Sequence, residues 1–382
     1  MTTRRTAALL VSCTLAALAG CASSSTGGSA AARDGVTGDA ILTLEDARGD
    51  RSARETLTML NLPLPGLGGA DTEPVEWSQL ETRGTADWAT SPVSIDSRRG
   101  LALVAGEEGV TLVRTRGSIE RVGETVTGHA IASVSLAPSG MGVALSEDGT
   151  TLHLLNTSDD ALTHEGAFPL AMTLGEGAHA GVALLNQHNQ LAILDEGRSR
   201  VEMMRLSRTN DGAISLEALW EQPTGDGPVA GAWTSDGRTL VVAEKMLSDE
   251  LASELEILAA SGRVSFFPSN AGDPTRVMLP GRPTAMTVSP DGSRVGVVLD
   301  RREGPTLALV MNGRSGAALL DSTRIGEPAA GVAFDTRGRH LLVALPEVGA
   351  LGVWAVEGTT LRDTDMRVET GPGVSAVAIA GD

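Results

Sequence analysis

The chain has 382 residues, with 30 basic and 48 acidic side chains and a formal net charge of −18. An acidic surface repels phosphate backbones and anionic lipid headgroups, so this charge argues against a nucleic-acid partner. With five Trp, four Phe and no Tyr, the interior is left to small aliphatic side chains, which suits closely stacked sheets.

Residues 1–20 divide into the zones of an export signal peptide. Arg4 and Arg5 form a basic head, and residues 6–19 are uncharged and mostly apolar. This stretch is shorter than the roughly 20 apolar residues that a helix needs to span a bilayer. It ends in Leu18-Ala19-Gly20-Cys21, which resembles the lipobox of bacterial lipoproteins, and an ordinary secretory signal is the alternative.

The lipobox resemblance implies cleavage between Gly20 and Cys21 and a diacylglyceryl group on the Cys21 thiol. With a second acyl chain, the protein would be stably anchored at a membrane of the cell envelope. In a Gram-negative cell, resemblance to the lipoprotein sorting rule, with Ala22 rather than aspartate after the cysteine, would favour the outer membrane, facing the periplasm. Cys13 leaves with the signal, so the sequence predicts no intrachain disulfide and no cysteine-ligated metal. The covalent lipid on Cys21 is the only non-protein group expected.

Residues 21–39 are rich in Ser, Gly, Ala and Thr and are predicted to form a flexible, lipidated tether. Residues 40–382 contain no comparable stretch and no second transmembrane candidate, so they are predicted to form one folded domain.

The domain contains an internal repeat in which a short apolar segment, a tight turn and a second apolar run follow one another. The turns lie at positions 100, 140, 189, 237, 292 and 338, at intervals of 40, 49, 48, 55 and 46 residues. Pro, Asp and Gly supply the fixed, side-chain-capped and left-handed conformations that tight turns need. The residues predicted to build these turns are Gly140, Asp236, Gly237, Pro290, Asp291, Gly292 and Gly338.

The two apolar segments of each repeat predict two kinds of strand. The first segment alternates apolar residues, such as Val332 and Phe334, and therefore has one apolar face. The second is almost continuously apolar, which is typical of a strand covered on both faces. One such hairpin cannot bury its own faces, and the interval leaves room for two more strands. The sequence predicts an all-β fold, a β-propeller of four-stranded blades.

The C-terminus supports closure of this propeller. Val374 to Ile379 repeats the first strand shortly before the chain ends, so it needs partners from another part of the chain. Segments 41–44 and 57–60 are expected to supply them, in a blade shared by the N- and C-terminal strands that removes two free sheet edges. Six full copies and this shared blade make seven, with six or eight blades as alternatives.

The turn Ser289-Pro290-Asp291-Gly292 resembles that of the bacterial WD40-like, YVTN-lactonase-like and TolB-like propellers. Ser235-Asp236-Gly237 and Pro138-Ser139-Gly140 match it in part. The resemblance covers about residues 90–382. It implies the architecture but does not choose among the many activities that propellers host.

No catalytic or metal-ligating constellation is predicted. None of the six histidines has a spacing that places two ligands on one metal, although His179 and His188 flank an inner strand and are candidates to face a central channel. The Asp236 and Asp291 carboxylates are interpreted as turn caps, with calcium binding as the alternative. The longest insertion, residues 246–258, is predicted to be a loop on one rim that leads into a strand at 255–258, with a helix as the alternative.

Three functions are compatible with these features. The first is a non-catalytic binding or scaffolding module, tethered to membrane lipid, that presents blade loops to a protein of the envelope. The second is an enzyme resembling lactonase-like propellers, which would process a small ligand at the central channel. The third is an outer-membrane assembly lipoprotein, similar to the propeller partner of the β-barrel insertion machinery.

Overall fold

The computed structural model describes residues 37–44, 55–63, 77–82, 93–96, 98–115, 119–157, 161–171, 180–208, 214–225, 227–246, 261–313, 316–370 and 373–380, the first three ranges by their backbone. Within these ranges, 28 strands form seven four-stranded antiparallel sheets. Gly20, Cys21, His179 and the strand predicted at 255–258 lie outside the described residues.

Blade 1 combines both ends of the domain. It contains, from the axis outward, β28 (Val374–Ala380), β1 (Thr37–Leu44), β2 (Glu55–Pro63) and β3 (Trp77–Thr82).

The other blades are each built from four consecutive strands. Blade 2 contains β4 (Val93–Asp96), β5 (Leu101–Ala105), β6 (Gly109–Arg114) and β7 (Glu120–Val126). Blade 3 contains β8 (Ile131–Leu136), β9 (Met141–Ser146), β10 (Thr151–Asn156) and β11 (Thr163–Pro169). Blade 4 contains β12 (Ala180–Leu185), β13 (Gln190–Asp195), β14 (Arg200–Arg208) and β15 (Ile214–Pro223).

Blades 5 to 7 follow the same order. Blade 5 contains β16 (Gly227–Trp233), β17 (Thr239–Met246), β18 (Ser261–Pro268) and β19 (Thr275–Leu279). Blade 6 contains β20 (Arg282–Val288), β21 (Arg294–Asp300), β22 (Thr306–Gly313) and β23 (Gly316–Arg324). Blade 7 contains β24 (Gly331–Phe334), β25 (His340–Leu345), β26 (Ala350–Glu357) and β27 (Thr360–Glu369).

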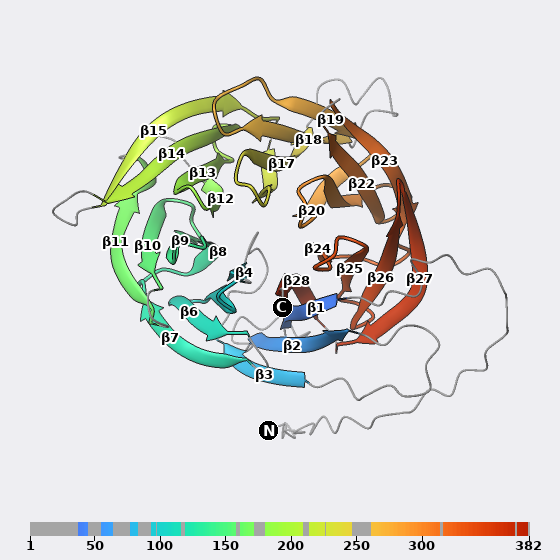
Figure 1. Ribbon diagram of the computed structural model, residues 1–382, viewed down its shortest axis with the longest axis horizontal. Coiled ribbons are helices and arrows are strands. Elements are labelled where there is room, and N and C mark those ends of the chain that lie inside the picture. Colours follow the sequence, from blue (N-terminus) through green and yellow to red (C-terminus); the bar gives the residue numbers. More distant parts are fainter. Residues whose placement is uncertain are drawn as a thin grey trace, which may run out of the picture.

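The sheets stand around one axis, with the first strand of each blade innermost (Figure 1). This arrangement confirms the predicted β-propeller of four-stranded blades. The ring is closed as the sequence indicates, because β1 pairs with β28 in antiparallel register from Asp39↔Ala380 to Leu44↔Val374. In Figure 1 the blue β1 accordingly lies beside the red β28. β1 begins at Thr37, three residues before the expected start of the domain.

The hydrophobic core is divided among the spaces between neighbouring blades. The second strands are its centre: every residue of β5 and β25 is buried, as the continuous apolar runs predict. One cluster joins blades 3 and 4 through Leu145, Leu154 and Ile193, and another joins blades 6 and 7 through Leu309, Leu341 and Trp354. The outermost strands are largely exposed. Each blade is therefore stabilised by its neighbours rather than by a core of its own.

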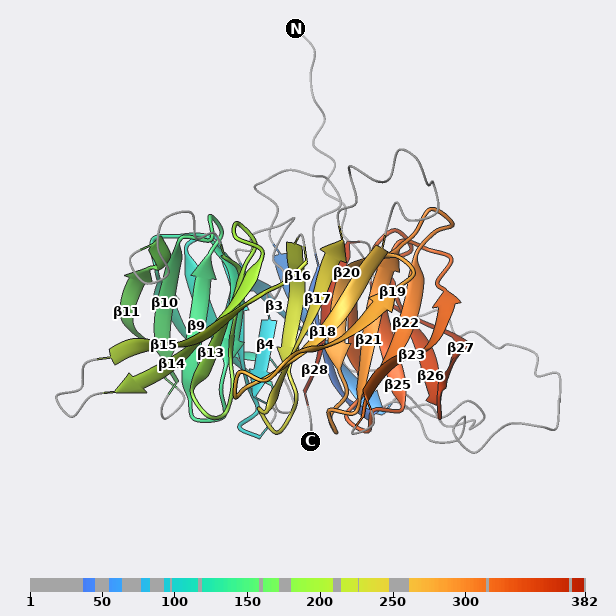
Figure 2. The same cartoon turned by 90° about the horizontal axis from the view of Figure 1, so that it is seen from above.

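Antiparallel pairing gives the disc two different rims (Figure 2). We call one the closing rim, because β28 ends and β1 begins there. It also carries the turns between the first and second strands of blades 2 to 7, of which the described residues are 98–100, 137–140, 186–189, 234–238, 289–293 and 335–339. The opposite rim carries the connections between second and third strands and those between blades. The closing rim is the lower one in Figure 2.

Candidate functional site

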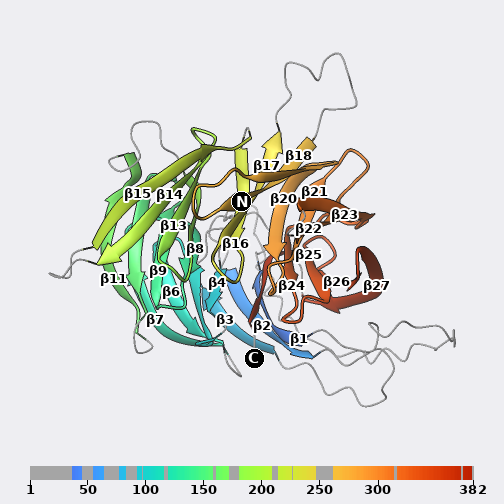
Figure 3. The ribbon, with the colours of Figure 1, turned by 45° about the horizontal axis from the view of Figure 1, so that its top comes forward.

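The propeller has a cavity of about 600 Å³ on its axis, lined by residues of the inner strands β4, β16, β20, β24 and β28. Figure 3 shows β4, β16, β20 and β24 around the centre of the ring. Most lining side chains are small or apolar, such as Ala232, Val332 and Ile379. The inner strands have no ladder partner on the axial side, so their backbone N–H and C=O groups contribute polar surface to the cavity. This gives a cavity suited to water or a small uncharged ligand.

One titratable side chain, Asp335, belongs to the described lining of this cavity. It is fully buried, and its Oδ2 lies 3.0 Å from Nδ1 of His340. Its Oδ1 accepts hydrogen bonds from the backbone N–H groups of Arg339 and His340, at 2.7 and 3.1 Å. These contacts engage Asp335 in the turn between β24 and β25. A hydrolase needs an acid or base directed at its substrate, and the described lining offers none that is not already engaged.

The predicted turn residues lie on the closing rim, and the glycines among them have the left-handed backbone conformation that glycine adopts without strain. Gly140, Gly237, Gly292, Gly338 and Asn189 have φ values of 87°, 67°, 71°, 66° and 57°. Pro290 of the same turns also lines the cavity.

The turn carboxylates act as caps. Oδ1 of Asp236 accepts hydrogen bonds from Arg238 N and Thr234 Oγ1, at 3.0 and 2.7 Å, and these bonds lower the pKa of Asp236. Burial raises the pKa of Asp291, but hydrogen bonds from Ser289 Oγ and Ser293 outweigh burial, so this pKa also lies below its usual value. No group of three or more His, Cys, Asp or Glu side chains able to hold a metal occurs among the described residues.

The turns also contact one another from blade to blade, which their sequence does not reveal. Nδ2 of Asn186 donates to the carbonyl oxygen of Gly237 on the next blade at 2.9 Å. A Cβ atom on Gly292 would lie 3.2 Å from Cβ of Thr234 on the preceding blade. The closing rim is therefore a ring of touching turns.

We expect Gly292→Ala to lower the free energy of unfolding by about 2 kcal/mol or more. Roughly 1 kcal/mol comes from the left-handed φ, and the rest from the crowding against Thr234. The matched control is Gly358→Ala, because Gly358 has φ +65° but no atom within 4 Å of its added Cβ. Urea denaturation of both variants measures the difference. If both variants lose the same free energy of unfolding, crowding between the turns contributes nothing to the effect of Gly292→Ala.

The histidines lie in places that their spacing did not predict. His188 is exposed on the closing rim, where its Nε2 lies 3.0 Å from the carbonyl oxygen of Asp236, and it is absent from the cavity lining. Three others, His129, His153 and His164, meet at the boundary of blades 2 and 3. Ring centroids are 5.1 Å apart for His129 and His153 and 5.3 Å apart for His153 and His164.

His153 is the buried member of this cluster. It is 1% exposed, its Nδ1 lies 3.2 Å from Nε2 of His164, and its Nε2 has no hydrogen-bond partner among the described residues. Burial, with a smaller contribution from the nearby His164 and His129, lowers the pKa of His153 to about 4. The ring is therefore neutral in the folded protein at neutral pH.

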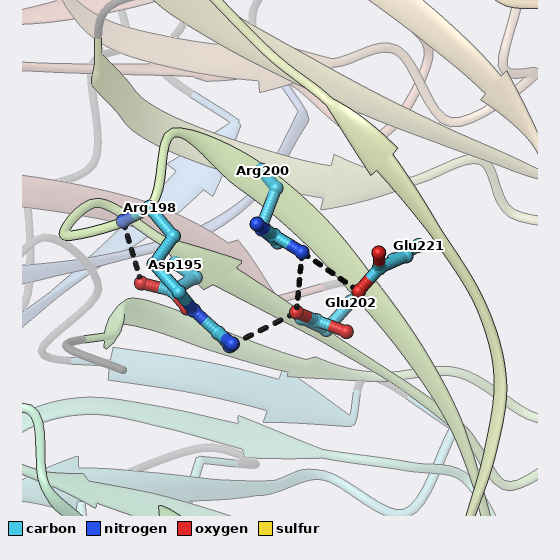
Figure 4. Close-up of polar contacts among 5 residues, drawn as sticks. All are labelled: Asp195, Arg198, Arg200, Glu202 and Glu221. Atoms are coloured by element: carbon cyan, nitrogen blue, oxygen red, sulfur yellow. Dashed lines mark hydrogen bonds and ion pairs between the residues drawn. The ribbon is translucent and has the colours of Figure 1, made fainter. Parts of the chain in front are cut away.

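Blade 4 contains a network of charged side chains near the opposite rim (Figure 4). Arg198 Nε lies 2.5 Å from Oδ2 of Asp195, and Arg198 Nη2 lies 3.0 Å from Oε1 of Glu202. Arg200 lies between Glu202, at 3.8 Å, and Glu221, at 2.8 Å. Burial raises the pKa of Glu202 against the opposing effect of Arg198. These contacts stabilise the turn between β13 and β14, and none of the five side chains belongs to the cavity lining.

Blade 5 repeats this use of a buried acid. Glu244 is fully buried, and its Oε2 accepts hydrogen bonds from Nε of Arg263 and from Gly225 N, both at 2.5 Å. The ladder register places Asp195 and Glu244 at the same position of their blades, where blades 3 and 6 have Ser146 and Leu299. Blades 4 and 5 thus each contain an ion pair with a buried acid near the opposite rim.

No helix among the described residues is long and apolar enough to cross a membrane. No protein-family model matches the sequence, and no curated protein is significantly similar to it.

Solved structures do match the fold. A periplasmic gluconolactonase, PpgL, from Pseudomonas aeruginosa superposes with a TM-score of 0.62 at 17% identity, over 90% of this chain and 99% of that one. A functionally unknown protein from Desulfotomaculum acetoxidans superposes with a TM-score of 0.64 at 15% identity, over 90% of this chain and 99% of that one. The β-propeller domain of Cps50 (Swd1) from Myceliophteria thermophila superposes with a TM-score of 0.57 at 14% identity, over 85% of this chain and 98% of that one. At these identities the likeness concerns the fold, and the chain is a β-propeller protein of the architecture that lactonase-like and WD40-type propellers share.

Proposed function

We propose that this protein is a lipoprotein of the cell envelope whose propeller is a non-catalytic binding module for another envelope protein. Support comes from the export signal and lipobox in residues 1–21, the tether that follows, and the propeller fold. In a Gram-negative cell the anchor would lie in the outer membrane, with the propeller in the periplasm.

The observation that carries the non-catalytic assignment is the lining of the axial cavity. Asp335, its one described titratable side chain, is occupied by His340 and by backbone N–H groups. Activated hydrolytic groups depend on perturbed pKa values in a cleft, and the one histidine with a pKa strongly lowered, His153, is not part of the cavity lining.

A lactonase-like enzyme is the second candidate, and two observations favour it. The axial cavity, about 600 Å³, is of a size for a small ligand, and a gluconolactonase is among the structures that share the fold. For this candidate, catalytic groups would have to come from residues beyond the described lining.

The two candidates are separated by one experiment on the full-length lipidated chain. After crosslinking in native membranes, the binding module predicts recovery of one partner protein in stoichiometric amount, which Cys21→Ala should reduce by removing the anchor. The same preparation should not hydrolyse a panel of sugar lactones above the uncatalysed rate. Lactone turnover that persists in purified protein, without a recovered partner, would reverse the assignment. Mass spectrometry of the N-terminal peptide tests the lipid independently.

A further inference from the structure

The turns between first and second strands, which lie on the closing rim, are rich in arginine. The described turns between first and second strands, with the first residue of β21 included, carry six arginines and two exposed carboxylates, Asp236 and Asp291. Hydrogen bonds keep the pKa values of both carboxyls low, so both are charged at neutral pH. The arginines, all exposed or partly exposed, are Arg98, Arg99, Arg238, Arg294, Arg337 and Arg339.

The described turns between second and third strands, on the opposite rim, are rich in carboxylates. Its described turns between second and third strands in blades 2, 3, 4 and 7 carry six exposed carboxylates, and the one arginine among them, Arg198, is paired with Asp195 and Glu202. In blade 6 the corresponding turn holds two arginines and one glutamate. The six carboxylates belong to Glu107, Glu108, Glu147, Asp148, Glu196 and Glu347.

The chain enters the domain at the arginine-rich rim. β1 begins at Thr37, and its Asp39 pairs with Ala380 at the end of β28, on the same side as the arginine-bearing turns. The segment that precedes Thr37 is the predicted tether from Cys21. A membrane anchor at Cys21 would therefore pull on this rim and not on the acidic one.

We propose that the closing rim rests against an anionic lipid surface, with Arg238, Arg337 and their neighbours facing the headgroups and the acidic rim facing away. This inference rests on the proposed lipid anchor. Charges are screened over about 8 Å at physiological ionic strength. A six-residue strand separates the rims by about 20 Å, so the acidic rim contributes little repulsion at the membrane. The ring of touching turns gives the arginines a rigid, shared platform.

The orientation can be measured with a fluorophore on each rim in turn. Ser235→Cys places a thiol on the closing rim and Val348→Cys places one on the opposite rim, and both native side chains are exposed. Since Cys21 would carry the lipid, each variant would have one reactive thiol. The full-length lipidated proteins are bound to phosphatidylcholine vesicles with about one third phosphatidylglycerol and a headgroup-linked quencher. Quenching is expected to be about threefold stronger at position 235 than at position 348.

This difference should disappear in about 1 M salt and on vesicles of phosphatidylcholine alone, while the protein stays bound through its lipid. Arg238→Gln with Arg337→Gln should also reduce it. Equal quenching at both positions on the anionic vesicles overturns the inference and leaves the anchor intact. An N-terminal peptide without lipid contradicts the anchor, and mass spectrometry distinguishes that failure from the first.

A soluble polyanion is the competing ligand for such a rim. If dextran sulfate protects the probe at position 235, in a manner that depends on Arg238 and Arg337, while vesicles give no preferred orientation, then the rim binds soluble anionic polymers. That result would overturn the assignment to lipid.

Discussion

Replacing Arg263 with methionine is expected to lower the free energy of unfolding by about 3–5 kcal/mol. The side chain volume is roughly kept, but Glu244 loses its ion-pair partner while it remains fully buried. Removing one member of a buried pair is much more costly than removing both, because an uncompensated charge stays in a medium of low polarity. Glu244 also accepts the hydrogen bond of Gly225, so the connection between blades 4 and 5 should loosen as well.

The double variant Arg263→Met with Glu244→Gln tests this explanation. A neutral glutamine still accepts the Gly225 N–H, so most of the lost stability should return. Arg205→Met is the surface control, because Arg205 and Glu217 are both exposed and their pair, at 3.6 Å, is worth about 1 kcal/mol or less. Guanidinium denaturation measures all three. If Arg263→Met costs no more free energy of unfolding than Arg205→Met, the buried pair does not stabilise blade 5 or its connection to blade 4.

The sequence predicted the parts of the fold that depend on local patterns. The alternation at Val332 and Phe334 and the continuous run at 341–344 became adjacent strands of one blade. The turn glycines could be recognised because a left-handed φ restricts the choice of residue. The outer strands, such as β15, could be predicted only from the length of the repeat, which leaves room for two more strands. Their own residues gave no signal, because their exposed faces carry no regular apolar pattern.

The side-chain clusters could not be predicted, because they depend on which blades become neighbours. Glu244 and Arg263 are 19 positions apart, on strands whose pairing register the sequence does not state. His129 reaches His153 from the connection between blades 2 and 3, at no spacing used by a known metal motif. His188 was a candidate for the central channel, yet its side chain contacts the neighbouring turn of the closing rim, at the carbonyl oxygen of Asp236.

The folded protein is expected to lose stability as the pH falls below neutrality, through His153. Its pKa is about 4 in the folded state and about 6.5 when unfolded, so the unfolded chain binds the proton first. The contribution of the neutral ring is complete above pH 6.5 and is lost progressively between pH 6.5 and pH 4. Between pH 7.5 and pH 5 the loss should be about 2 kcal/mol.

His153→Leu should remove this pH dependence, because leucine of similar size has no proton to bind and leaves no buried ring nitrogen without a partner. The measurement is urea denaturation of wild type and variant at pH 7.5, 6 and 5, a range in which most carboxylates stay ionised. His188→Leu is the control, because it replaces an exposed imidazole outside this cluster. A wild-type slope that survives in His153→Leu would mean that the proton is taken up elsewhere, and the boundary between blades 2 and 3 would then not be the acid-sensitive part of the ring.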